Sequence, residues 1–272
     1  MERIVAIVTP KEKNRWTNEY LVSLTDLERL ISYLGIYGFH DILFLGYTGE
    51  YNRLSLDEAK TIIEFAEEYK CKIKKKGNVV INISRDTKEE VFELMKLSEF
   101  CDYFMISKNN LSNNGFFEII NKCKKPVIYY LKKDENELLY YLLNEEKIIG
   151  IKDSLKGKYE ERKKKIESYG KIYYFGDDLN FLKEKKGNII SGTIQLFPQL
   201  WKEEKYDLIE KIVEKIEEKK KDVDFPKICK YMLSFSPPFV PLIKGDDLDE
   251  ETIKKLEEIK DFYIELKRKY KF

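Results

Sequence analysis

Short runs of apolar, often β-branched residues alternate along the chain with longer segments in which apolar residues recur at helical spacing. The apolar runs predict eight strands, over residues 4–8, 41–45, 78–83, 103–107, 126–130, 148–152, 171–175 and 188–191. Several of the intervening segments begin with a capping box, the typical start of a helix, at Thr25 with Glu28, Ser55 with Glu58, and Thr87 with Glu90. The pattern therefore predicts a regular alternation of strands and helices.

Eight strands that alternate with helices favour an α/β fold, a (β/α)8 TIM barrel, over an open doubly wound sheet. A doubly wound dinucleotide-binding fold would need a G-x-G-x-x-G turn after a strand, and the sequence contains none. After the eighth strand the pattern is purely helical, with charged amphipathic segments at residues 201–221 and 250–269. We expect a barrel over residues 1–198 and a C-terminal helical appendage packed on it over residues 199–272. Residues 234–241, which contain three prolines, are expected to form a stiff turn between helices.

The composition excludes several classes of function. The 50 Lys plus Arg and 49 Asp plus Glu leave a net charge of +1, which does not indicate binding to nucleic acid or to an acidic membrane surface. The four cysteines, Cys71, Cys101, Cys123 and Cys229, form no CxxC pair, so free thiols are expected and no metal site. No apolar stretch approaches bilayer-spanning length, and residues 3–8 already read as a strand. We expect a cytoplasmic protein.

The residue with the clearest chemical potential is Lys152, which ends the sixth expected strand. Catalytic groups of a (β/α)8 barrel lie at the C-terminal ends of its strands. Apolar surroundings disfavour the ammonium form, so a lysine there can act as a neutral nucleophile near pH 7 and condense with a ketone. The alternative interpretation is a solvated surface lysine, since the chain has 50 Lys plus Arg.

Other polar residues end neighbouring strands and suit a keto acid. The turn Gly46-Tyr47-Thr48-Gly49 offers backbone N–H groups and a hydroxyl that can hold a carboxylate. Tyr130 ends the fifth expected strand, where a phenol can carry protons during addition and bond cleavage. The remaining candidates at strand ends are Thr9, Asp177, Asp178 and Ser191. Taken singly, the turn can be an ordinary turn and the tyrosine a cap on the core.

Several segments, in this order, resemble the class I pyruvate-dependent aldolases of the dihydrodipicolinate synthase and N-acetylneuraminate lyase superfamily. They are Val8-Thr9-Pro10, Gly46-Tyr47-Thr48-Gly49-Glu50 with Leu54-Ser55-Leu56-Asp57-Glu58, Pro126-Val127-Ile128-Tyr129-Tyr130, Gly150-Ile151-Lys152-Asp153-Ser154, Gly176-Asp177-Asp178, and Ile190-Ser191-Gly192 to Phe197-Pro198. The resemblance implies a barrel enzyme, usually a homotetramer, that binds pyruvate as a Schiff base. It implies no metal and no organic cofactor.

The resemblance also implies roles for individual residues. Lys152 would form the Schiff base, Tyr130 would relay protons, and Thr48 with the adjacent Gly49 backbone would hold the carboxylate. Further substrate contacts are implied for Thr9, Ser154, Gly176, Asp178, Ile190 and Ser191.

Three departures from the family pattern bear on function. Tyr47 stands where the family usually has a threonine of the proton relay, so we expect its phenol to take over that role. The loop after the fourth expected strand reads Ser107-Lys108-Asn109-Asn110-Leu111, without the tyrosine that a neighbouring subunit often supplies. After Tyr130, Lys132 and Lys133 stand where dihydrodipicolinate synthases have an arginine for the carboxylate of aspartate semialdehyde.

The missing arginine and the segment Ser236-Pro237-Pro238-Phe239 are similar to archaeal 2-keto-3-deoxygluconate aldolases. The sequence therefore favours reversible cleavage of 2-keto-3-deoxygluconate, or its 6-phosphate, to pyruvate and glyceraldehyde. The alternative is dihydrodipicolinate synthase, which condenses pyruvate with aspartate semialdehyde. A third hypothesis is a barrel that binds a keto acid without turnover, suggested by Tyr47 and the altered loop at residues 107–111.

Overall fold

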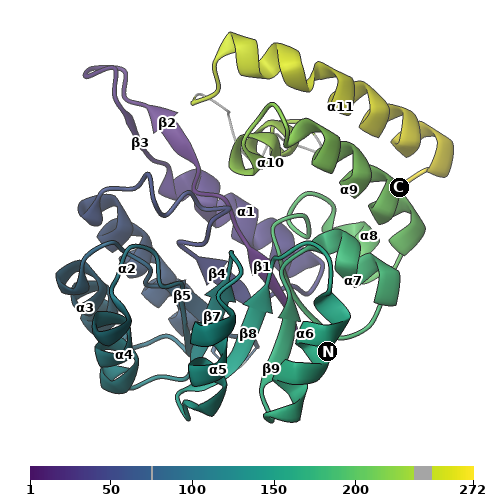
Figure 1. Cartoon of the computed structure of the whole chain (residues 1–272). Coiled ribbons are helices and arrows are strands. Elements are labelled where there is room, and N and C mark those ends of the chain that lie inside the picture. The colour runs from purple at the N-terminus through teal and green to yellow at the C-terminus, as the bar shows by residue number, and fades with distance from the viewer. Residues whose placement is uncertain (75, 236–246) are drawn as a thin grey trace.

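The predicted (β/α)8 barrel is confirmed by the computed structural model, which describes residues 1–74, 76–235 and 247–272 (Figure 1). Eight parallel strands follow the order β1-β10-β9-β8-β7-β6-β5-β4, and pairing of β1 with β4 closes the barrel. The strands are β1 (Arg3–Ala6), β4 (Ile42–Phe44), β5 (Val79–Asn82), β6 (Tyr103–Ile106), β7 (Val127–Leu131), β8 (Ile148–Asp153), β9 (Ile172–Phe175) and β10 (Asn188–Ser191).

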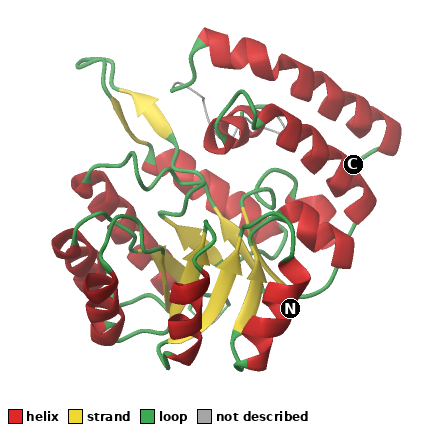
Figure 2. Ribbon diagram, in the orientation of Figure 1, coloured by secondary structure: helices red, strands yellow, loops and turns green. Residues whose placement is uncertain are grey.

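Apolar side chains lie on both faces of the strands. This explains why apolar residues follow one another in these segments instead of alternating with polar residues. The inward-facing set fills the barrel interior and includes Met105, Ile128, Tyr174 and Ile190, all at most 1% exposed. The outward-facing set packs against the helices that surround the sheet (Figure 2). The barrel interior is therefore a packed core that ends beneath the strand termini.

The helices follow the strands in the expected alternation. They are α1 (Leu24–Ile36), α2 (Leu56–Ile73), α3 (Lys88–Leu97), α4 (Asn113–Lys122), α5 (Asn136–Asn144), α6 (Tyr159–Ser168), α7 (Asp178–Glu184), α8 (Pro198–Lys202), α9 (Tyr206–Lys219), α10 (Phe225–Leu233) and α11 (Glu250–Tyr270). The capping box at Ser55 is confirmed, because its hydroxyl accepts from the Glu58 N–H and the Glu58 carboxylate accepts from the Ser55 N–H. The Thr87 hydroxyl likewise accepts from the Glu90 N–H.

Two expected helix boundaries are wrong. Helix α1 has Ser23 rather than Thr25 as its N-cap, because the Ser23 N–H is held by the Pro10 carbonyl and the helix starts directly after it. The expected single helix over residues 201–221 is divided into α8 and α9, because Glu204 between them adopts a left-handed backbone with φ of 55°. The expected stiff turn extends from Ser234 into residues that lie outside the described part, and the Ser236-Pro237-Pro238-Phe239 segment lies there entirely.

A two-stranded hairpin of β2 (Lys11–Lys13) and β3 (Tyr20–Val22) is absent from the sequence prediction. Its first strand is Lys-Glu-Lys, which carries no apolar alternation. The hairpin projects from the barrel between β1 and α1, and helices α9 to α11 gather at the end toward which the strand arrowheads point (Figure 1). Within the described ranges, no helix is both long enough and apolar enough to cross a membrane.

Candidate active site

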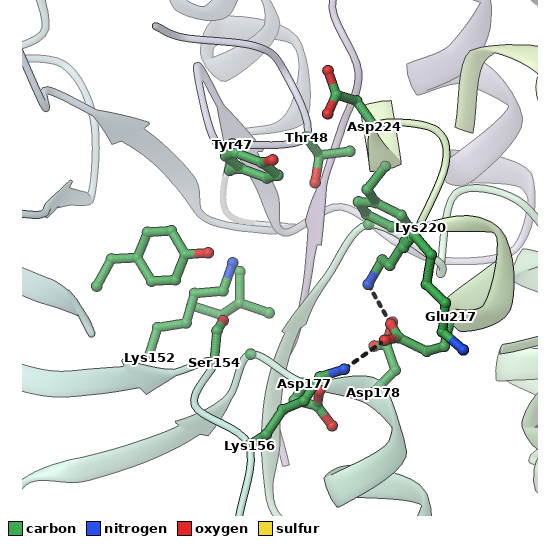
Figure 3. Close-up of a pocket in the computed structure, with 16 residues that line it drawn as sticks. Tyr47, Thr48, Lys152, Ser154, Lys156, Asp177, Asp178, Glu217, Lys220 and Asp224 are labelled. Carbon is green, nitrogen blue, oxygen red and sulfur yellow. Dashed lines mark hydrogen bonds and ion pairs between the residues drawn. The ribbon is translucent and has the colours of Figure 1, made fainter. Parts of the chain in front are cut away.

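A cavity of about 400 Å³ lies at the C-terminal end of the barrel strands (Figure 3). Most of the residues predicted to act on a substrate line it: Tyr47, Thr48, Tyr130, Lys152, Ser154, Gly176, Asp178 and Ile190. They come from β7, β8 and β10, from the loops after β4, β8 and β9 and, for Asp178, from the start of α7. Parallel strands that close into a barrel bring these distant segments to one rim.

Lys152 lies at the base of this cavity. In the strand register it pairs with Tyr130 of β7 on one side and with Tyr174 of β9 on the other. The side chain is 6% exposed, and its Nζ lies 4.5 Å from the centre of the Tyr130 ring. Burial is the main cause that lowers the pKa of Lys152 to about 8. The positive charges of Lys132 and Lys220 also lower this pKa, whereas the negative charge of Asp178 raises it. The buried lysine that the sequence predicts is thus a weakly basic amine.

This pKa predicts how the reactivity of Lys152 depends on pH. With a pKa of about 8, about one amine in ten is uncharged at pH 7, against about one in three thousand for an ordinary lysine. We expect the rate at which borohydride traps pyruvate on the protein to rise about tenfold per pH unit below pH 8 and to level above it. Trapping rates measured from pH 6 to pH 10 test this, and a rise that continues to pH 10 would contradict the lowered pKa.

The two phenols at the cavity differ in their surroundings. Tyr130 packs against the barrel core, and burial raises its pKa to about 12, with the nearby Tyr47 and Tyr51 adding to the effect. Tyr130 is therefore protonated at neutral pH and can donate a proton. Tyr47 is 43% exposed and lies beside Thr48 (Figure 3). Its position permits the predicted exchange of protons with a substrate above Lys152.

The turn after β4 has the form expected of a carboxylate-binding loop. Within the described residues, no hydrogen bond engages the backbone N–H groups of Thr48 and Gly49, while the Thr9 hydroxyl donates to the Gly49 carbonyl at 2.8 Å. The buried Lys230 of α10 pairs with Glu50 at 2.6 Å and anchors the turn from the other side. Thr9 and Gly49 do not line the cavity. Thr9 lies behind the turn and holds its Gly49 carbonyl in place.

The loops after β8 and β9 meet too closely for any residue but glycine at position 176. A Cβ there would lie 2.2 Å from the Ser154 Oγ and 3.0 Å from the Lys152 Cε. Ser154 Oγ and one carboxylate oxygen of Asp178 are buried and form no hydrogen bond within 3.5 Å in the described structure, although Ser154 lies close enough to Tyr130 to lower the pKa of its phenol. Unpartnered buried polar atoms in a cavity are groups that a hydroxylated ligand can satisfy. Gly176 thus allows two such groups to approach the amine.

Burial raises the pKa of Asp178 to about 6, although Ser191 and Lys220 oppose this. Asp178 is therefore mostly ionised at pH 7 and can accept a hydrogen bond from a hydroxyl. Ser191 itself does not line the cavity, and its hydroxyl lies 3.0 Å from that of Thr193. Ser191 therefore acts on the site through Asp178, whose pKa it lowers.

The two lysines after Tyr130 do not reach into the cavity. Lys132 donates to the Tyr51 hydroxyl at 2.8 Å and to the Asn109 side-chain oxygen at 3.0 Å. Its Nζ lies 5.6 Å from the centre of the Tyr130 ring, on the side of Asn109. Lys133 is exposed and pairs loosely with Glu135 at 3.5 Å. Neither lysine is placed to hold the far end of a substrate in the cavity.

Sequence reasoning missed the contribution of the C-terminal helices. Glu217 and Lys220, at the end of α9, line the cavity, together with Lys156 of the loop after β8. The sequence held one indication that Lys220 points inward. Lys220 follows Val213 and Ile216 at helical spacing, so it lies on the same buried face of the helix.

The structure holds no group of three or more His, Cys, Asp or Glu side chains arranged to bind a metal ion among the residues it describes. Cys101, Cys123 and Cys229 are buried and Cys71 is exposed, and none forms a disulfide.

Comparison with known proteins identifies the fold. No family model and no curated protein sequence match the chain. Dihydrodipicolinate synthase from Aquifex aeolicus is similar, with 20% identity and a TM-score of 0.75 over 96% of this chain and 97% of that chain. The Oceanobacillus iheyensis dihydrodipicolinate synthase is 19% identical, with a TM-score of 0.73 over 96% of both chains. YagE, an E. coli K12 prophage protein of the dihydrodipicolinic acid synthase family solved with pyruvate, is 18% identical, with a TM-score of 0.71 over 95% of this chain and 98% of that chain.

Proposed function

We propose that this protein is a class I pyruvate-dependent aldolase, a carbon–carbon lyase that holds its keto-acid substrate as a Schiff base on Lys152. The observation that carries the proposal is the burial of the Lys152 amine against the Tyr130 ring at the C-terminal end of the barrel. The turn after β4, which borders the same cavity, has backbone N–H groups free to donate to a carboxylate. A reactive amine and an anion cradle are the two parts that an α-keto acid requires.

The preferred substrate is 2-keto-3-deoxygluconate or its 6-phosphate. The Lys152 amine adds to the C2 ketone, and loss of water gives the iminium ion. In that dehydration the Tyr130 phenol protonates the departing hydroxyl of the carbinolamine. The phenolate so formed then accepts the proton of the C4 hydroxyl. The C3–C4 bond breaks, its electrons pass into the iminium as an enamine, and the aldehyde leaves. Protonation at C3 and hydrolysis release pyruvate and restore the amine.

The hydroxyl partners in the cavity support a sugar acid. Ser154 Oγ, close to the Tyr130 phenol, and one oxygen of Asp178 are buried at the cavity that contains Lys152 and form no hydrogen bond within 3.5 Å in the described structure. An unmet hydrogen-bonding group penalises a ligand that lacks the matching hydroxyl.

The second candidate is condensation of pyruvate with aspartate semialdehyde. It is favoured by the names of the similar solved structures from Aquifex aeolicus and Oceanobacillus iheyensis. Against it, Lys132 is held by Tyr51 and Asn109 and the exposed Lys133 pairs with Glu135, so neither lysine of the loop after β7 faces the cavity. Loss of one charge-assisted contact costs roughly 1.5–3 kcal/mol.

We expect kcat/KM for cleavage of 2-keto-3-deoxygluconate or its 6-phosphate to exceed that for pyruvate plus aspartate semialdehyde by at least about tenfold, the rate equivalent of that lost contact. Coupled assays for pyruvate release and for semialdehyde consumption measure the two values on one preparation. Efficient condensation with negligible cleavage of either sugar acid would assign the second function. Pyruvate trapping without turnover of any substrate would instead favour a keto-acid-binding protein.

A further inference from the structure

The end of helix α9 places a cation inside the cavity. Its buried stripe ends at Ile216, and Lys220, one turn later, extends into the cavity with its Nζ 4.4 Å from the centre of the Phe225 ring. Burial by itself would lower the pKa of Lys220, but Glu217 and Asp178 outweigh it and leave that pKa raised. Lys220 is therefore charged at neutral pH, and its apolar neighbour limits competition from water.

Lys220 belongs to a cluster in which one carboxylate serves two ammonium groups. Glu217 forms an ion pair with Lys220 and a second with Lys156 at 3.3 Å. Figure 3 shows both interactions and places the cluster across the cavity from Lys152. Each ammonium group has three donors, so both retain N–H groups for a ligand. The Lys156–Glu217–Lys220 cluster carries one uncompensated positive charge.

Three further acids, Asp177, Asp178 and Asp224, and one further lysine, Lys221, line the cavity. Asp224 pairs with Arg53, and Asp177 caps helix α7 by accepting from the Asn180 N–H at 2.9 Å. The negative charge of Asp178 raises the pKa of both Lys220 and Lys152, so this carboxylate lies near both ammonium groups. The carboxylate that faces Lys220 is thus shared with the reacting amine.

The position of the cluster relative to Lys152 suggests which part of a substrate it meets. The turn at Thr48, whose N–H groups at Thr48 and Gly49 form no hydrogen bond in the described structure, borders the same cavity as Lys152. The cluster lies across the cavity from Lys152, with Asp178 near it (Figure 3). A six-carbon keto acid that extends from Lys152 across the cavity brings its last carbon toward Lys220.

We propose that the Lys156–Glu217–Lys220 cluster binds an anionic group, in the first instance a phosphate, on the terminal carbon of the substrate whose ketone reacts with Lys152. This inference rests on the proposed aldolase function and selects the phosphorylated sugar acid within it. Lys220 supplies the main contact because it is the less exposed of the two lysines, at 34% against 81% for Lys156. Glu217 positions both ammonium groups.

The kinetic test compares acceptor aldehydes in the condensation with pyruvate: glyceraldehyde 3-phosphate, glyceraldehyde and aspartate semialdehyde. In Lys220→Met the ratio of kcat/KM for the phosphorylated over the neutral aldehyde should fall at least about tenfold, the scale of one charge-assisted contact. Lys219→Met is the matched control, because the adjacent Lys219 pairs with Glu258 of α11 and does not line the cavity. An equal ratio in Lys220→Met and wild type would overturn the proposal. A selective loss with aspartate semialdehyde alone would assign the site to a carboxylate.

A binding measurement separates this proposal from the proposed function. Calorimetry with glycerol 3-phosphate and with glycerol requires no turnover and no Schiff base. Wild-type protein should bind glycerol 3-phosphate at least about tenfold more tightly than Lys220→Met does. Equal affinity in the two proteins refutes the anion site even if pyruvate is trapped on Lys152. Tighter binding by wild type without any trapping refutes the aldolase and leaves the anion site standing.

Discussion

Replacement of Lys152 by methionine is expected to abolish both borohydride trapping of pyruvate and turnover, with residual kcat below about one thousandth of wild type, because removal of a covalent nucleophile removes the reaction path. Methionine keeps most of the buried stem, so the fold should persist although Lys152 is only 6% exposed. Mass spectrometry of the peptide that contains residue 152 should show one reduced pyruvyl group in wild type and none in the variant.

Lys147 provides the matched control for this experiment. It precedes the same strand, β8, at the opposite end of the barrel and is exposed. Lys147→Met should retain both trapping and turnover. A reduced adduct at any other lysine, or activity that persists in Lys152→Met, would rule out the proposed mechanism.

Replacement of Tyr130 by phenylalanine should lower kcat by roughly 100-fold or more, the scale of general acid–base catalysis. Burial raises the pKa of Tyr130 to about 12, so the phenol holds its proton until a substrate draws it. The ring still packs on the barrel core, so far-UV circular dichroism should be unchanged. Pyruvate should still be trapped on Lys152 in this variant, more slowly.

Tyr129 is the matched control because it precedes Tyr130 in β7 but faces outward. Its hydroxyl donates to Glu135 at 2.5 Å and its ring packs against Phe116. Tyr129→Phe should cost roughly 1.5–3 kcal/mol of stability, the scale of a hydrogen bond to a charged group, with kcat nearly unchanged. Tyr47→Phe should also slow turnover, since its phenol stands in the relay position. A kcat unchanged in Tyr130→Phe would contradict the proton-relay assignment.

Much of the fold was predictable because strand and helix periods are local properties of the sequence. The eight barrel strands were found within two residues at each end, and β10 at its observed bounds. That β7 and β8, which carry Tyr130 and Lys152, are neighbours also follows from sequence order, because consecutive strands of a parallel barrel are adjacent, whereas the register that pairs the two residues was not predicted. The β2–β3 hairpin was missed because its first strand, Lys-Glu-Lys, has no apolar pattern to mark it.

The sequence by itself determined which groups end the strands around Lys152, since barrel topology carries strand-end residues to one rim. Only the tertiary structure decided which of them face the cavity: Thr48 lines it, whereas Thr9, close to the same turn, holds the Gly49 carbonyl from behind. It also decided that Lys220 enters the cavity. That position depends on how α9 docks over the barrel, through long-range packing and the Glu217 and Lys156 ion pairs, and no local pattern determines such docking.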